Sequence, residues 1–182
     1  DIDSKDHLLH ASLTTPLGAL TGYAYLLEED IPTKNGLDTI GLRLAGSKKL
    51  GEQTFTYLAE YATQDYERGA VEADVDYFLL EAGTTISKVT AKLGYESLGS
   101  DKGTYGFSTP LATLHAFEGW ADVFLATPAQ GIVDAYLSLA VPVAGGSFAF
   151  IYHDYSADES TATIDDLGSE INLQWTQPFK GK

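Results

Sequence analysis

The sequence predicts an all-β fold: an antiparallel up-and-down transmembrane β-barrel, or a large part of one, with about nine strands and a short helix in its longest loop. Three observations predict this fold. Runs of alternating apolar and polar residues recur along the chain, and short and long connections alternate between them. No stretch approaches the roughly 18 uninterrupted apolar residues of a transmembrane helix. Because only helices and closed barrels span a bilayer, a barrel is the one form in which this chain would cross a membrane.

Nine segments have the alternation of strands, and most are about nine residues long, the length that crosses a bilayer when tilted. In the third segment, Ile40 and Leu42 share one face while Arg43 lies on the other. The predicted strands are His7–Thr14, Ala19–Leu27, Thr39–Ser47, Thr54–Ala62, Tyr77–Thr85, Val89–Glu96, Val133–Val141, Ser147–His153 and Gly168–Thr176.

The connections between these strands differ in length in a regular way. Four are short enough for hairpin turns: Thr15–Gly18, Lys49–Glu52, Ile86–Lys88 and Ala144–Ser147. Four are predicted to be long: Glu28–Asp38, Gln64–Asp76, Ser97–Ile132 and Asp154–Asp166. All short turns would then lie at one end of the strands and all long loops at the other, as in bacterial outer-membrane barrels.

The longest connection contains apolar residues at helical spacing between Pro110 and Pro128, which predicts a short amphipathic helix. This helix either folds into a lumen as a constriction or packs across the mouth of the barrel. Its polar and aromatic residues that would form a constriction are His115, Glu118, Trp120 and Asp122.

Each predicted strand has an apolar and a polar face, and alternation alone does not say which of them points inward. Aromatic residues at both ends of the strands favour membrane girdles, so the polar faces are interpreted as lining a lumen. The lumen-lining candidates are Arg43, Glu60, Glu81, Lys92, Glu96, Glu170, Asn172 and Gln174. Mixed charge on facing strands offers a hydrophilic path for small polar solutes, or else the charges pair within a narrow closed barrel.

Composition narrows the classes of partner. The 182 residues suit a single domain, 1–182, and the net charge of −15 argues against nucleic acid. The chain has no cysteine, so it has no disulfides or thiolate metal sites. It has no Met and begins without a signal peptide, which predicts either a mature form or a piece of a longer protein.

No motif points to catalysis or to a cofactor, so an enzyme is not expected and no catalytic or metal residue is assigned. His115 and Glu118 are one helical turn apart, which is a weak metal signal next to a solvent-facing helix rim. The acidic loops are either solvated faces or surfaces that recruit divalent cations or steer cationic solutes. Their carboxylates are Asp65, Glu67, Glu72, Asp74, Asp76, Asp154, Asp158, Glu159, Asp165 and Asp166.

Several segments are similar to a known family: Leu20–Asp30, Thr54–Glu67, Tyr77–Gly83, Lys92–Ser100 and, most specifically, Phe107–Pro128. Together they resemble the C-terminal half of proteobacterial outer-membrane proteins of the alginate-export-like porin family, and the resemblance extends over most of the chain. The resemblance implies a large antiparallel barrel in the bacterial outer membrane, of which nine strands would be about half. The odd strand count agrees with this, because complete bacterial barrels have even numbers. With only 11 Lys and Arg, the chain lacks the basic lumen expected for a polyanion.

The first functional hypothesis is therefore an outer-membrane porin or channel for passive passage of small hydrophilic solutes. Its expected partners are membrane lipids, these solutes and further copies of the chain in a homo-oligomer. The alternative is a soluble, secreted β-barrel or sandwich that binds a ligand in its apolar interior or through its acidic loops. A third reading is a non-transporting structural barrel whose loops meet a partner. The direction in which the apolar strand residues point separates the first two, and lumen width separates the third from the first.

Overall fold

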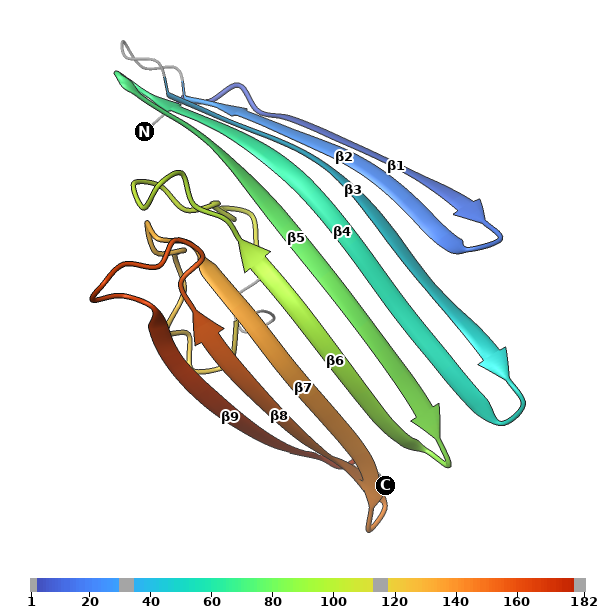
Figure 1. The fold of residues 1–182 in the computed structure, drawn as a ribbon. Helices are drawn as coiled ribbons and strands as arrows, with labels where there is room; N and C mark the ends of the chain where they lie inside the picture. Colours follow the sequence, from blue (N-terminus) through green and yellow to red (C-terminus); the bar gives the residue numbers. More distant parts are fainter. Residues whose placement is uncertain (1–2, 30–34, 113–117, 179–182) are drawn as a thin grey trace.

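The computed structural model describes residues 3–29, 35–112 and 118–178. In these residues the chain forms one nine-stranded sheet in which every strand pairs antiparallel with the next, in the order β1 to β9 (Figure 1). The all-β, up-and-down prediction is confirmed. The strands are β1 (His7–Thr15), β2 (Gly18–Glu28), β3 (Asn35–Leu50), β4 (Gln53–Arg68), β5 (Val71–Ile86), β6 (Val89–Leu98), β7 (Ile132–Val143), β8 (Gly146–Ser156) and β9 (Asp166–Thr176).

The sheet is open within the described residues, because β1 and β9 each pair on one side only. Figure 1 shows them as the two outer edges of a long, curved sheet. The nine strands therefore form an open sheet in this structure and not a closed barrel.

Four two-residue turns connect the strands at one end of the sheet, as the sequence predicts: 16–17, 51–52, 87–88 and 144–145. In two of them both central residues have positive φ: Ser87 and Lys88, then Ala144 and Gly145. This backbone matches the twist of paired strands, which makes the connection tight.

The predicted long connection Gln64–Asp76 is wrong. Strands β4 and β5 continue through it and meet at a turn of two residues, Gly69 and Ala70, where Gly69 has a φ of +65°. The physical reason is that alternation persists here: Gln64 and Val75 are buried on one face, while the acidic residues all occupy the other. The density of acidic residues predicts a loop, whereas their spacing follows the period of a strand.

The predicted helix between Pro110 and Pro128 is also wrong. None of the described residues in 110–112 and 118–128 is helical, and residues 113–117 lie outside the described part. Positive φ angles at Glu118, Gly119 and Asp122 interrupt any helical run. Within the described residues, no helix is long and apolar enough to cross a membrane.

The two faces of the sheet differ in what covers them. The β6–β7 connection, described over 99–112 and 118–131, packs on one face of the sheet, the covered face; the opposite face is the open face. On the covered face Phe107 contacts Tyr77, and Phe124 contacts Tyr155, with ring centroids 5.4 and 5.0 Å apart. The core lies between this connection and the strands and comprises Ala62, Val75, Tyr77, Leu79, Leu98, Phe107, Ile132 and Tyr155.

The open face carries large apolar side chains in the middle of the strands. Leu42, Leu80, Leu93 and Leu173 are all more than half exposed, at 54, 51, 63 and 62%. The strand register places them on the same face of the sheet, opposite to the core. This structure therefore exposes a continuous apolar surface and covers part of its polar one.

Candidate functional site

The candidate site is the covered face, because the register brings all eight predicted lumen-lining residues to it. Arg43 and Glu60 are directly opposite each other, and Glu96 opposes Leu79 of the neighbouring strand. Asn172 is buried, whereas Gln174 is exposed at the short-turn end of β9. The structure thus groups these residues on one surface, and their contacts divide them into two sets.

The first set consists of two carboxylates that are each neutralised by a base. Glu60 lies 3.7 Å from Arg43 Nε and accepts a 2.7 Å hydrogen bond from the Tyr23 hydroxyl. Glu81 lies 2.8 Å from Lys92 Nζ and accepts a 3.0 Å hydrogen bond from the Tyr136 hydroxyl. Both carboxylates are largely buried, so base and hydroxyl together offset the cost of removing them from water.

Each of these pairs depends on a glycine in the strand between. Tyr23 of β2 reaches Glu60 of β4 by lying across Gly41 of β3, where a Cβ would come within 2.2 Å of the ring. Tyr136 of β7 crosses Gly94 of β6 in the same way, and a Cβ there would come within 2.0 Å of its ring. The glycines therefore leave room for a tyrosine to span three strands.

The second set lies under the β6–β7 connection and has no such bases. Glu96 Oε1 accepts a 2.6 Å hydrogen bond from Tyr77, and Asp134 Oδ2 lies 2.7 Å from His153 Nδ1. Glu170 Oε1 accepts bonds from the backbone N–H groups of Trp120 and Ala121, at 2.6 and 2.9 Å. The carboxylate of β9 thereby fastens the connection to the sheet.

Several buried polar atoms of this region have no hydrogen-bond partner among the described residues. They are Asp134 Oδ1, the Tyr155 hydroxyl and Asn172 Nδ2. The Asp134 side chain is 1% exposed, so its second oxygen is withdrawn from bulk water without a donor. Such orphaned groups are costly and mark a place where a ligand or water completes the structure.

The predicted constriction residues are only partly placed. His115 lies outside the described residues. Trp120 and Asp122 are half-buried, and Glu118 is half-buried beside the covered face. Burial, followed by the negative charges of Glu96 and Asp134, raises the pKa of Glu118 to about 8. The connection thus brings one more carboxyl group to the second set.

Sequence analysis missed Tyr23, Tyr136 and Asp134, and it gave His153 no role beyond the end of a predicted strand. His153 instead faces Asp134 within the sheet, and its ring stacks on Tyr155 with centroids 5.6 Å apart. Gly41 and Gly94 were the available signal for the two tyrosines, because a glycine on the polar face of a strand leaves space for an aromatic side chain from the next strand.

The acidic loops show structural roles for several carboxylates. Asp158 accepts a hydrogen bond from the backbone of Ser100, Asp165 accepts one from Ser160, and Asp166 accepts one from Gly168. In the described part of the chain, no three His, Asp or Glu side chains are grouped as a metal site would require. Divalent cations at these loops stay a prediction.

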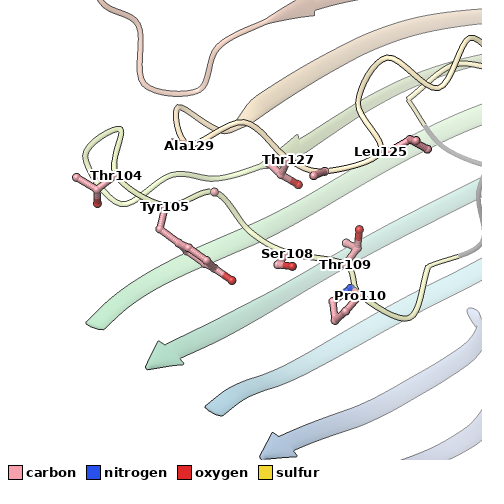
Figure 2. A pocket seen from close by; sticks show the side chains of 10 residues that line it. Thr104, Tyr105, Ser108, Thr109, Pro110, Leu125, Thr127 and Ala129 are labelled. Carbon is pink, nitrogen blue, oxygen red and sulfur yellow. The ribbon is translucent and has the colours of Figure 1, made fainter. Parts of the chain in front are cut away.

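The connection also forms a half-open cavity of about 270 Å³ between its segments 104–110 and 125–129. Figure 2 shows Tyr105, Ser108 and Thr109 on one side of it and Thr127 on the other. Its walls are tied together by a 2.6 Å hydrogen bond from Thr127 to the Phe107 carbonyl. The residues that line it carry no charge, so this cavity is separate from the carboxylates of the covered face.

No protein-family model matches the sequence, and no curated protein or solved structure is significantly similar to it. The likeness to alginate-export-like porins stays a prediction from the sequence.

Proposed function

We propose that the chain forms part of the wall of an outer-membrane β-barrel that gives small hydrophilic solutes passive passage. The observation that carries this proposal is the exposure of the apolar face combined with a charged, partly covered opposite face. In a soluble sheet the apolar face would be the buried one, and an extended exposed apolar surface marks contact with lipid or protein.

The height of the apolar surface supports a bilayer as that contact. On the open face of β5, side chains are apolar or uncharged from Phe78 to Ile86 and acidic at Asp76, Asp74 and Glu72. Positions 78–86 are nine residues, which matches the roughly 9–11 of a tilted transmembrane strand. The long β4–β5 hairpin would project beyond the membrane.

Aromatic residues lie at both limits of this surface. Tyr61 and Tyr95 are on the open face toward the long-loop end, and Trp175 is on it toward the short-turn end. All three are more than 40% exposed, and Tyr61 donates a 2.8 Å hydrogen bond to Asp76. Amphipathic rings in two bands fit the interfaces of a bilayer. Of the other aromatics at the long-loop end, Tyr77 instead faces the covered side, where it binds Glu96.

Strand direction constrains how the barrel would close. In this antiparallel order β1 and β9 run the same way, so their direct pairing would be parallel. An all-antiparallel barrel needs an odd number of further strands between them, which agrees with the even totals of bacterial barrels. Two copies of these nine strands, joined β9 to β1, would again meet in parallel. We therefore place the chain in a larger barrel, as the resemblance implies.

The test is conductance in planar bilayers after the chain is refolded in detergent, with heat-denatured protein and detergent alone as controls. Reproducible current steps from protein shown to have inserted are the expected result. Inserted protein without steps would contradict passive passage. Folding in plain buffer without partition into lipid vesicles would favour the soluble, ligand-binding alternative.

A further inference from the structure

The carboxylates of the covered face are unequally compensated. Glu60 and Glu81 each have a basic partner within 4 Å. The other four, Glu96, Asp134, Glu170 and Glu118, form no ion pair with Lys or Arg among residues 3–29, 35–112 and 118–178. The imidazole of His153 is the one basic group that contacts this set there. Carboxyl groups without a Lys or Arg partner in the described chain therefore gather where the β6–β7 connection crosses β6 to β9.

Orphaned acceptors show that this acidic region is incomplete by itself. Among the described residues, Asp134 Oδ1 is buried without a donor, and the Tyr155 hydroxyl, whose residue is 4% exposed, has no hydrogen-bond partner. The Tyr155 hydroxyl and Glu170 Oε2 both lie within 2.5 Å of the point that a Cβ on Gly119 would occupy. They therefore face one small space that Gly119 keeps free, next to the backbone that Glu170 fastens.

The arrangement favours an organic cation over a metal ion. The described carboxylates do not converge as the ligands of one metal. Instead they are interspersed with the rings of Tyr77, Phe107, Phe124 and Tyr155. An ammonium group of moderate size takes hydrogen-bond acceptors on some sides and aromatic faces on others, which is the setting that such cations prefer.

We propose that this acidic region selects small organic cations of the ammonium type and disfavours anions on the path along the covered face. The inference rests on the proposed function, since it names the class of solute that would use that path. Glu96 and Asp134 supply the field, which Glu118 joins once it ionises above pH 8, and Asp134 Oδ1 and the Tyr155 hydroxyl supply unpaired acceptors. The neutralised pairs near Arg43 and Lys92 contribute little to it, because each carboxylate is already matched by a base.

A fluorescence measurement tests the inference without requiring a pore. The chain has two tryptophans, and the Trp175→Phe variant leaves Trp120, whose backbone binds Glu170. Quenching of Trp120 by caesium, iodide and neutral acrylamide is measured in refolded protein at low ionic strength and pH 9, where the carboxyl groups of the region are ionised. The expected result is a caesium-to-iodide quenching ratio above that of free tryptophan amide, with caesium quenching reduced by added ethylammonium chloride. A ratio at or below the free value would overturn the inference.

Charge variants locate the effect. At 10 mM salt, removal of one charge about 10 Å from the probe changes the ratio of local cation to anion by about two- to threefold. We expect Glu96→Gln to lower the quenching ratio by about this factor, since Gln retains an oxygen for the Tyr77 hydrogen bond. Glu52→Gln removes the same charge at the β3–β4 turn, at the far end of the strands, and is expected to leave the ratio unchanged. Equal effects of the two variants would refute the assignment.

Reversal potentials in a gradient of ethylammonium chloride separate this inference from the proposed function. Current that favours ethylammonium over chloride, and favours it less in Glu96→Gln, supports both. Current with anion preference, or with a preference that Glu96→Gln does not alter, refutes the inference and leaves the pore. Absence of any current from inserted protein contradicts the pore, and the quenching experiment then decides the cation site.

Discussion

Replacement of Glu118 by Gln should remove a pH dependence from the docking of the β6–β7 connection. Glu118 is half-buried, and its pKa is raised to about 8 by burial and by the charges of Glu96 and Asp134. Among the described residues, the strands packed around it also bring His153, which faces Asp134, together with Glu170 and the Tyr155 hydroxyl. In the undocked chain the same carboxyl should titrate near its ordinary value of about 4.3.

The sign follows from proton binding. Between the ordinary pKa and pH 8 the docked state holds a proton on Glu118 that the undocked state has released, so stability falls as pH rises through this window. From pH 6 to 8, two units at about 1.4 kcal/mol each give at most about 3 kcal/mol, and partial solvent access to the carboxyl lowers this figure. Above pH 8 both states are ionised and the contribution stops changing.

The assay is a urea titration followed by Trp120 emission in the Trp175→Phe background, at pH 6, 7, 8 and 9. We expect the docking free energy to fall with pH more steeply in the parent than in Glu118→Gln, with the two lines parallel above pH 8. The Glu52→Gln variant should follow the parent, because that residue is exposed at a turn. Parallel lines for parent and Glu118→Gln from pH 6 onward would refute the reasoning.

Three further substitutions test the fold and its surroundings. Gly94→Ala should destabilise the protein by about 1–3 kcal/mol in urea unfolding, because the added Cβ would lie 2.0 Å from a tyrosine ring. Gly22→Ala is the control and should cost far less, because nothing lies within 4 Å of its Cβ position. Equal costs would contradict the role of Gly94 in letting the tyrosine cross the strand. Leu93→Arg should cost about 2–4 kcal/mol in lipid vesicles if the open face meets the bilayer, and under about 0.5 kcal/mol if it meets water. Glu170→Ala should raise acrylamide quenching of Trp120, because two backbone hydrogen bonds are lost, and unchanged quenching would show that the connection docks without them.

The strands and short turns were predictable from the sequence because period-2 alternation and turn residues are local signals. The face shared by Arg43 and Glu60 followed from the same period. The extension of β4 to Arg68 was not predicted, because consecutive acidic residues resemble a loop unless their alternation with Gln64 and Tyr66 is considered. In this segment the period of two residues predicts the structure better than the density of charge does.

Tertiary contacts set the limit for the rest. The apolar spacing after Pro110 predicted a helix, yet Phe107 and Phe124 bury their rings separately against strands far away in sequence. In the sequence Asp134 has the position of an ordinary polar strand residue, and only the strand register shows that it lies beside His153. Long-range pairing of this kind leaves no pattern in a single local window.

The two kinds of carboxylate on the covered face imply different roles, and the difference follows from the cost of burying charge. Glu60 and Glu81 carry a base and a tyrosine each, so a passing ion would have to compete with partners already in place. These units stabilise the sheet by linking three strands at a time. Within the described part of the chain, Glu96 and Asp134 have only neutral or weakly basic partners, so cations from solution balance their charge. The preference of the pore for cations over anions should therefore change when Glu96 is replaced by Gln. It should stay almost constant in the double variant Arg43→Gln with Glu60→Gln, which removes that ion pair as a unit. Reversal potentials of the two variants make the comparison directly.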